Sequence, residues 1–251
     1  MRTGRDRSGR AGARAALLVA ALAAAVVPVV SAWGARPSAP RTIEFSGYTW
    51  TVKASAGKVG PGPNHFSSSS RNVWVDAEGK LHLRITSSRG RWYCAEVVNT
   101  QSLGRGTYTW MLDSPVDALD RNVVLGLFTW NDDPAYNHRE IDWEAARWGN
   151  AADPTNGQYV VQPWDGDGNL QRILLTPGAS PSTQSFTWGV RSVSFASSSA
   201  SPASWTYAGP DVPPPGGENA RMNLWLFRGA APSDGREVEV VIRSFQFQPL
   251  P

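Results

Sequence analysis

The segment HREIDWEAARWG, residues 138–149, places three carboxylic acids at alternate positions, Glu140, Asp142 and Glu144. Like charges at this density repel one another unless one of the acids keeps its proton. In a β-strand, alternate residues share one face, so the three acids would meet there. In a helix, Glu140 and Glu144 would be neighbours, and Asp142 would point away.

Three acids on one face of a strand suit glycoside hydrolysis. Burial and mutual repulsion raise the pKa of at least one of them, so one acid stays ionised while another stays protonated near neutral pH. A retaining glycosidase needs this division between a nucleophile and a proton donor, with the two carboxyl groups about 5–5.5 Å apart. Residues 140 and 144 lie roughly 13 Å apart along a straight strand, so strand curvature and leaning side chains must close the gap. His138 falls on the same face by the same period of two.

Two other interpretations of the acids are open. On a solvated strand, Arg139 or Arg147 could neutralise them by ion pairing. The acids could also bind a hard cation such as Ca²⁺, although such sites usually draw their oxygen ligands from loops. The segment DGDGN, residues 165–169, begins like a calcium loop but has Leu170 where that loop needs Gly. We therefore expect no required cofactor and no metal site, and the sequence leaves a structural Ca²⁺ ion open without indicating one.

The rest of the chain is typical of short strands rather than helices. Runs rich in β-branched and aromatic residues are bounded by Gly, Pro, Asn or Asp, and no long segment has helical periodicity. This pattern predicts an all-β antiparallel sandwich, and it favours a strand for residues 138–148. The other predicted strands are residues 43–53, 72–86, 91–100, 106–113, 122–130, 158–164, 169–175, 185–197, 221–227 and 237–248.

The N-terminus predicts export. Residues 1–14 are rich in Arg, 16 apolar residues follow, and Ser31-Ala32 offers a small-residue cleavage site, as in a secretory signal peptide. The alternative is an uncleaved N-terminal membrane anchor. We expect a signal peptide over residues 1–32, a Pro-containing linker over 33–42 and one domain over 43–249. The chain without residues 1–32 has 19 basic and 20 acidic residues, which gives no reason to expect nucleic-acid binding.

The cysteine and tryptophan contents are also informative. Cys94 is the one cysteine of the sequence, so no intramolecular disulfide can form. It lies in a strand-like run, where its expected role is that of a small buried hydrophobic residue. The sequence has 12 Trp, more than a core of this size needs, and the excess suggests flat apolar faces against which sugar rings could lie.

The acid motif and its flanks resemble glycoside hydrolase family 16, the lichenase-like and laminarinase-like β-glucanases. EIDWE, residues 140–144, is similar to the ExDxE active-site strand of that family. Four further segments resemble other strands of the family, and the resemblance in order and spacing covers residues 43–249. These segments are LGRGTYTWMLD (103–113), NVVLGLFTWND (122–132), RMNLWLFRG (221–229) and VVIRSFQFQP (240–249).

The resemblance implies a concanavalin A-like β-sandwich, or jelly roll, of two antiparallel sheets with a concave substrate cleft. It also implies a retaining double displacement in which Glu140 is the nucleophile, Glu144 the general acid/base and Asp142 the assisting acid. The substrate-binding candidates are Glu96, Trp130, His138, Trp164, Asn223 and Trp225. The simpler alternatives are that Trp130 and Trp225 belong to the core and that Glu96 is a solvated strand acid.

We therefore expect a secreted, endo-acting, retaining glycoside hydrolase that cleaves internal β-glycosidic bonds of a polysaccharide, with a β-glucan as the first candidate. The alternatives are a non-catalytic carbohydrate-binding protein of the same fold and a transglycosylase. The expected partner is the polysaccharide, with no nucleic acid and no stable membrane association, and the chain is expected to be a monomer. His138, Val98 and Ala145 depart from the residues that many family members carry, so the sugar specificity is open. The uninterrupted ExDxE spacing resembles members that act on β-1,4-containing backbones.

Overall fold

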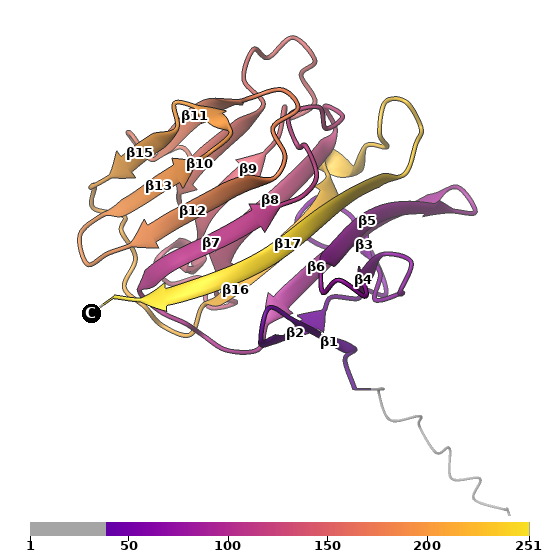
Figure 1. The fold of residues 1–251 in the computed structure, drawn as a ribbon, viewed down its shortest axis with the longest axis horizontal. Coiled ribbons are helices and arrows are strands. Elements are labelled where there is room, and N and C mark those ends of the chain that lie inside the picture. Colours follow the sequence, from indigo (N-terminus) through magenta and orange to yellow (C-terminus); the bar gives the residue numbers. More distant parts are fainter. Residues whose placement is uncertain (1–38, 251) are drawn as a thin grey trace, which may run out of the picture. The chain divides into compact units, whose positions relative to one another are not determined.

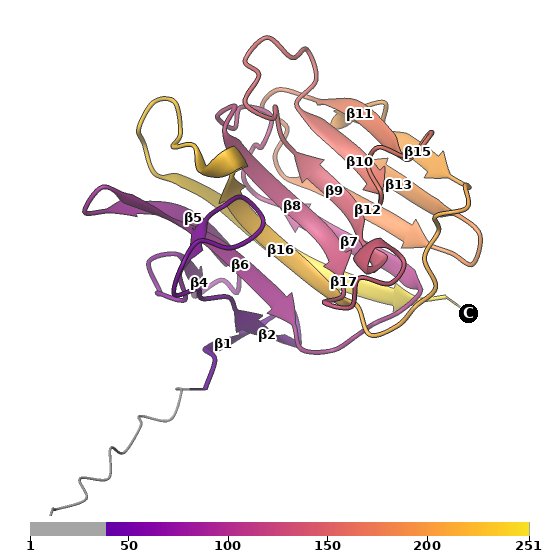
Figure 2. The ribbon, with the colours of Figure 1, turned by 180° about the vertical axis from the view of Figure 1, so that it is seen from behind.

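The computed structural model describes residues 39–250, which form two β-sheets packed face to face (Figure 1, Figure 2). The predicted signal peptide, 1–32, and residues 33–38 of the predicted linker lie outside the described residues. The first strand begins at Thr42 and the last ends at Pro249. In the described part of the chain, no helix is long and apolar enough to cross a membrane.

One sheet carries the three acids and is called here the carboxylate sheet. Each of its eight main strands is antiparallel to the next, and the short β3 (His65–Phe66) adds to it parallel to one of them, β6 (Arg91–Asn99). In order across the sheet, the strands are β1 (Thr42–Phe45), β2 (Tyr48–Val52), β6, β16 (Asn219–Leu226), β8 (Val123–Trp130), β9 (Ile141–Ala145), β10 (Gly157–Val161) and β11 (Leu170–Leu175).

The second sheet is called the opposite sheet, and it is also antiparallel. Its strands in order are β4 (Val73–Val75), β5 (Leu81–Ser88), β17 (Val238–Pro249), β7 (Gly106–Leu112), β12 (Ser182–Trp188), β13 (Val193–Ser197) and β15 (Ser204–Tyr207). The hairpin of β5 and β6 connects the two sheets, and β14 (Ala200–Ser201) pairs with β11. The described helical elements are two 3₁₀ turns, η1 (Asn137–Arg139) and η2 (Phe227–Gly229).

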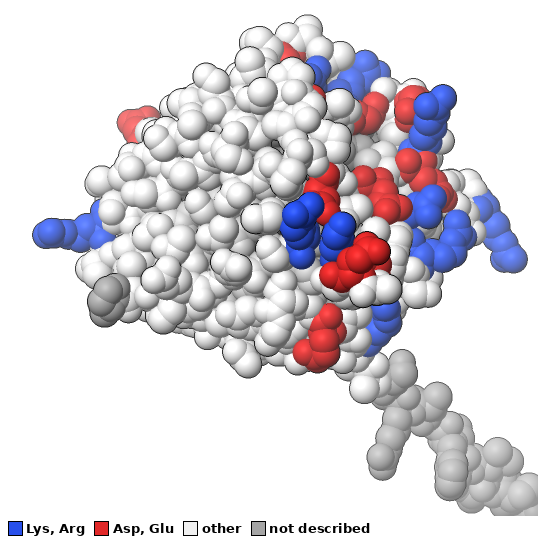
Figure 3. Space-filling model, viewed as in Figure 1, with Lys and Arg blue, Asp and Glu red and all other residues white. Residues whose placement is uncertain are grey.

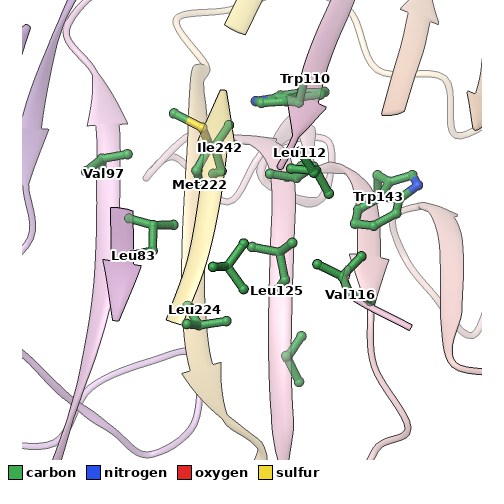
Figure 4. Close-up of a cluster of buried hydrophobic side chains, with 14 of the residues drawn as sticks. Leu83, Val97, Trp110, Leu112, Val116, Leu125, Trp143, Met222, Leu224 and Ile242 are labelled. Carbon is green, nitrogen blue, oxygen red and sulfur yellow. The ribbon is translucent and has the colours of Figure 1, made fainter. Parts of the chain in front are cut away.

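The core lies between the two sheets and follows from the alternation of each strand. On β7, Tyr108, Trp110 and Leu112 are fully buried, while Thr107 and Thr109, which alternate with them, are half-buried on the outer side. Figure 4 shows side chains of both sheets, Trp110 and Trp143 among them, meeting in this layer. Each large apolar side chain contributes about 1.5–3 kcal/mol by leaving water, so this layer fixes which face of each strand is turned outward.

The structure confirms most predicted strands. The predicted segments 43–53, 72–86 and 185–197 each fold into two paired strands. The short strands β3, β14 and β15 were not predicted from the sequence. Cys94 is buried in the core, as expected, and its burial raises the pKa of the thiol to about 12.

Candidate active site

The three acids emerge on one face of β9, as the alternation predicts. Ile141, Trp143 and Ala145 are buried in the core, so Asp142 and Glu144 point away from it. Glu140 precedes the strand with an extended backbone, and its carbonyl oxygen accepts a hydrogen bond of 3.2 Å from the backbone N–H of Gln162. The strand interpretation is thus confirmed for residues 141–145, with Glu140 continuing its line.

Strand register places the third acid in a row that runs across six strands of the carboxylate sheet. Adjacent strands are about 4.8 Å apart, so Glu96 and Glu144, which are separated by three strand spacings, lie roughly 14 Å apart. Gly126 has no side chain, so the row is open beside Glu144. In strand order, the row consists of Glu96, Asn223, Gly126, Glu144, Gln158 and Arg172.

Burial and mutual repulsion raise the pKa of all three acids. Desolvation, with the charge of Glu144 as the next cause, raises the pKa of Glu140 to about 8. Desolvation, followed by the charge of Asp142, raises the pKa of Glu144 to about 8. Asp142 is only 3% exposed, and burial followed by the charge of Glu140 raises its pKa well above the ordinary range. The three acids therefore share protons at neutral pH, as acid/base chemistry requires.

Two glutamine side chains hold the acids from the neighbouring strand. The Gln158 amide donates to Oε2 of Glu144 at 2.7 Å, and the Gln162 amide donates to Oδ2 of Asp142 at 3.1 Å. The Gln158 oxygen accepts hydrogen bonds from Arg172 at 3.0 Å and from the Trp148 indole at 3.1 Å, so the NH₂ group is left to face Glu144. Each donor favours the ionised form of the acid that it binds, which partly offsets the effect of burial on its pKa.

A second cluster of polar side chains lies at the other end of the row, around Glu96. Glu96 is 1% exposed, so it is not the solvated strand acid of the simpler alternative. Its carboxylate forms an ion pair of 2.8 Å with Lys53, lies 3.5 Å from the guanidinium of Arg221 and accepts a long hydrogen bond of 3.4 Å from Asn223. Arg221 also reaches Asp132 at 3.2 Å and lies 5.9 Å from the centre of the Trp130 ring.

Two buried acceptors in this cluster have no hydrogen-bond donor. They are Oε1 of Glu96 and Oδ1 of Asn223. A Cβ atom built on Gly126 would lie 2.5 Å from Oδ1 of Asn223, so this oxygen extends over the open position of the row. Buried acceptors are nearly always paired in folded proteins, and two without donors beside a gap indicate a place for ligand hydroxyl groups.

The strand alternation by which His138 was predicted to join the acids is interrupted before β9, although the His138 ring still lies against Trp130, which alternates with Gly126 and Phe128 on the outer face of β8. Residues 136–139 all have positive φ, between 50° and 62°, so the chain makes a left-handed turn before the strand alternation begins. The His138 ring stacks on Trp130, with ring centres 3.9 Å apart and planes 9° apart, and its Nδ1–H donates to the Asn131 carbonyl at 2.9 Å. The imidazole therefore covers one face of the indole, and a sugar can contact Trp130 only by its other face or its edge.

Contacts on both sides hold the left-handed turn in front of Glu140. The Thr129 hydroxyl donates to the Arg139 carbonyl at 2.9 Å, and the Asn131 amide donates to the Gly216 carbonyl at 2.6 Å. The Arg139 side chain is buried against Gly216, where an added Cβ atom would overlap its Nε. Such contacts are needed because a left-handed conformation costs a non-glycine residue about 1–2 kcal/mol.

The two remaining tryptophan candidates differ in exposure. Trp225 shares the outer face of β16 with Asn223 by strand alternation, yet it is buried, with its ring centre 6.0 Å from that of Trp148. Trp164 is 63% exposed in the turn after β10, two residues beyond the Gln162 that binds Asp142. Trp164 is thus free for a sugar ring near the acids, whereas Trp225 forms part of the packed wall.

The alternative roles of the acids find no support in the described residues. Arg139 faces Asp133 at 3.9 Å, and none of the ion pairs among residues 39–250 joins Arg139 or Arg147 to the three acids. No group of three His, Cys, Asp or Glu side chains in this range is arranged to hold a metal ion.

The sequence analysis missed the supporting side chains Arg221, Gln158 and Gln162. The period of two could have found them. Arg221 alternates with Asn223 and Trp225 on β16, and Gln158 lies on β10, with Gln162 one position after the last residue of that strand. Their contacts with Glu96, Glu144 and Asp142 depend on strand register, which the sequence does not give.

Comparisons with known proteins agree with this architecture. No family model matches the sequence, and no curated protein matches it either. Among solved structures, a β-glucanase of Bacillus licheniformis superimposes with a TM-score of 0.61 and 20% identity, covering 80% of this chain and 92% of that one. A protein of Mycobacterium tuberculosis described as an immunostimulatory antigen and pseudo β-1,3-glucanase superimposes with a TM-score of 0.62 and 18% identity, covering 80% of this chain and 91% of that one. A lichenase from a mouse hindgut metagenome superimposes with a TM-score of 0.58 and 19% identity, covering 80% of this chain and 93% of that one.

These identities are low, so the likeness establishes the fold alone. The chain has the jelly-roll fold of β-glucanases and lichenases, as the resemblance of its acid motif to glycoside hydrolase family 16 implied.

Proposed function

We propose that this protein is a retaining glycoside hydrolase that cleaves internal β-glycosidic bonds of a polysaccharide, with a β-glucan as the substrate class. The observation that carries the proposal is the group of three acids at residues 140, 142 and 144, whose pKa values are raised by burial and by one another. A protein that only binds sugar gains nothing from burying three mutually repelling carboxyl groups, which costs folding free energy.

In the proposed mechanism, Glu140 attacks the anomeric carbon and Glu144 protonates the leaving oxygen. Two features favour the charge on Glu140. Asp142, deeply buried, keeps its proton and shares a hydrogen bond with Glu140, and the positive charge of Arg221 also lowers the pKa of Glu140. Glu144 then returns as the general base that activates water against the glycosyl-enzyme.

The substrate chain would cross the strands along the row from Glu96 to Glu144. Gly126 has no side chain of its own, so a sugar ring over this position would meet Oδ1 of Asn223 on one side and Glu144 on the other. Oδ1 of Asn223, which has no donor, would take a hydroxyl hydrogen of that ring, and Oε1 of Glu96, which lies 3.5 Å from the Arg221 guanidinium and has no hydrogen bond, would take another. Trp130 and the exposed Trp164 would offer apolar surface for neighbouring sugars.

The proposal includes secretion, with cleavage of the signal peptide predicted over residues 1–32. A polysaccharide too large to enter a cell requires its hydrolase outside. No cofactor enters the proposed reaction, because both carboxyl roles are filled by side chains of the chain itself.

A non-catalytic glucan-binding protein is the second candidate, because one of the solved structures of this fold is described as a pseudo β-1,3-glucanase. A transglycosylase, in which a sugar hydroxyl replaces water, would use the same three acids.

The test is a panel of mixed-linkage β-glucan, laminarin, xyloglucan and agar, with chromatography of the products over time. We expect oligosaccharides of intermediate length from at least one β-glucan at early times. For transglycosylation, a short oligosaccharide is added to the same reaction as an acceptor, and products longer than that acceptor would show the transfer. Binding without any product on all four polymers would refute hydrolysis and establish the binding protein.

A further inference from the structure

A groove of about 300 Å³ opens on the opposite sheet, away from the three acids. Its volume is at the lower end of the range of ligand sites, about 300–1,000 Å³. One wall is the β1–β2 hairpin, and the other is formed by β7 and the end of β17. The lining residues are Ser46, Tyr48, Thr107, Thr109, Gln246, Phe247 and Gln248.

The groove is built from well-packed parts. The Ser46 hydroxyl accepts a hydrogen bond of 2.9 Å from the backbone N–H of Phe245, which ties the hairpin turn to β17. The Tyr48 ring packs edge-on against Phe245 at 5.3 Å, and the Phe247 ring packs edge-on against Tyr108 at 4.9 Å. The two aromatic rings of the lining are therefore held in place before any ligand arrives.

The groove continues into a regular array of small polar side chains. Register places the outward residues of five neighbouring strands in two rows, about 4.8 Å apart from strand to strand. One row consists of Gln246, Thr109, Ser185, Ala196 and Ser204, and the other consists of Gln248, Thr107, Thr187, Ser194 and Thr206. Nine of these ten side chains carry a hydroxyl or a primary amide, and none is ionisable at neutral pH.

The absence of charge in this array is a local property. On the same sheet, titratable side chains of β5 meet those at and just before the start of β17: Arg84 forms an ion pair of 2.8 Å with Glu237, and His82 Nδ1 lies 2.8 Å from the carboxylate of Glu239. Figure 3 shows this division, with most Lys, Arg, Asp and Glu on one side and a broad uncharged area over β7, β12, β13 and β15 that has isolated charged side chains only at its margin. The charged side chains of the sheet are thus kept away from the groove and its array.

This chemistry selects its ligand. An anionic polymer or a nucleic acid would need Lys or Arg, and an apolar ligand would find mainly hydroxyl and amide groups. A neutral sugar chain offers many hydroxyl groups, each able to donate and accept, together with apolar ring faces for Tyr48 and Phe247. We infer that the groove of Tyr48, Thr109, Gln246 and Gln248 is a second, non-catalytic binding site for a chain of an uncharged β-glucan.

The choice of a β-glucan rests on the proposed function, whereas the neutrality and polarity of the groove do not. The groove lies between the β1–β2 hairpin, at the edge of the carboxylate sheet, and the opposite sheet, and none of its lining residues comes from β9, so a chain held in the groove leaves the acids free. A second site would keep the protein on a polymer and raise the local concentration of bonds at the acids.

The test is native affinity electrophoresis in gels that contain soluble mixed-linkage β-glucan. All variants carry Glu140→Gln, so that the polymer is not cut in the gel. Gln246→Ala with Gln248→Ala removes both amides, and Thr109→Arg separately fills the groove with a charged side chain. Ser70→Ala with Ser88→Ala is the control, because it removes two exposed hydroxyl groups that lie outside both the groove and the array.

We expect both groove variants to weaken glucan binding at least about fivefold, the effect of losing one significant contact, and the control to bind like its parent. Retardation should persist in about 0.5 M NaCl, because no charge takes part. Circular dichroism melting confirms that each variant is folded.

Equal retardation of the groove variants and the parent, or no retardation of any variant, would overturn the inference. The outcome is separate from that of the proposed function. A wild-type protein that cuts no glucan, but whose binding depends on Gln246 and Gln248, would retain the second site and lose the hydrolase. A wild-type protein that hydrolyses glucan, but whose groove variants bind glucan normally, would support the proposed hydrolase and overturn the second binding site.

Discussion

Glu140 and Glu144 are chemically alike, and each has a hydrogen-bond partner and a nearby cation that lower its pKa. Glu140 shares a hydrogen bond with Asp142 and is within the field of Arg221, and both lower its pKa against the effect of burial. Glu144 is bound by the Gln158 amide, which Arg172 and Trp148 hold in position. Both arrangements partly offset the effect of burial, and the pKa of each acid is raised to about 8, so the proposed roles of nucleophile and proton donor follow the order of the acid motif rather than a difference in pKa.

The role of Glu144 predicts chemical rescue. In Glu144→Ala, the rate of hydrolysis should fall by orders of magnitude. Azide should raise the rate of the variant at least about tenfold, because it attacks the glycosyl-enzyme without a general base. The product should be a β-glycosyl azide, which NMR identifies. An α-glycosyl azide would assign the nucleophile to Glu144 instead.

Gln158 should set the pH range of the reaction. Gln158→Leu removes a donor that favours the ionised form of Glu144, so the pKa of Glu144 should rise from about 8. If Glu144 is the proton donor, the alkaline limb of the kcat/KM profile should move to higher pH. Gln171→Leu, on the neighbouring strand with its amide on a backbone carbonyl, is the matched control and should leave the profile unchanged. An unmoved alkaline limb in Gln158→Leu would contradict the assignment.

At the scale of elements, the left-handed turn at residues 136–139 is the part that the sequence could not predict. The strands follow from alternation and turn residues, and β9 is placed by the apolar residues Ile141 and Trp143. Asn137 and His138 are residue types that adopt positive φ more often than most, but Tyr136 and Arg139 are not, so the sequence does not predict four positive φ angles in succession. The turn depends on contacts with Thr129 and Gly216 from distant parts of the chain, which only the folded structure brings together.

Gly216→Ala tests whether this turn positions Glu140. The added Cβ atom would overlap the Arg139 guanidinium group, so the turn should shift and kcat should fall at least about tenfold with little change in KM. The melting temperature should fall less than in a core substitution, because the turn lies at the surface. Gly57→Ala is the control, since a Cβ atom there meets nothing within 4 Å. Full activity of Gly216→Ala would remove the turn from the site.

For the whole molecule, the acids of the site oppose the stability of the fold. The core between the sheets stabilises the protein at all pH values, whereas the pKa of Glu144 is about 8 when folded and has an ordinary value of 4.5. Because the folded state holds the proton more tightly, stability is greatest below pH 4.5 as far as this group is concerned, and it is lost as the pH rises through 8.

Glu144→Gln should therefore raise the melting temperature at pH 8 by about 2–4 °C, the effect of roughly 1 kcal/mol in a domain of this size, and by less at pH 4.5. The matched control is Glu78→Gln, a substitution at an exposed acid, which should change neither value. Calorimetry at the two pH values measures the difference. A Glu144→Gln variant that is no more stable than the wild type at pH 8 would show that the Glu144 carboxyl group does not lower the stability of the fold at that pH.

The whole molecule also shows what the sequence predicts well. Alternation predicted the all-β sandwich and the common face of Asp142 and Glu144, and the motif resemblance named Glu96 and Asn223, which the fold places in one row with Glu144. The groove at Tyr48 and Gln246 has no such signal. It depends on how the first hairpin of the chain meets the last strand, nearly 200 residues later.

The stereochemistry of cleavage tests the central claim most directly. Time-resolved proton NMR of the wild-type protein, acting on the polysaccharide that gives products in the panel, records which anomer forms first. Double displacement through Glu140 and Glu144 predicts the β-anomer first, with the α-anomer appearing later by mutarotation. An α-anomer formed first would contradict a retaining reaction by these acids, and an absence of products from every β-glucan would contradict hydrolysis itself.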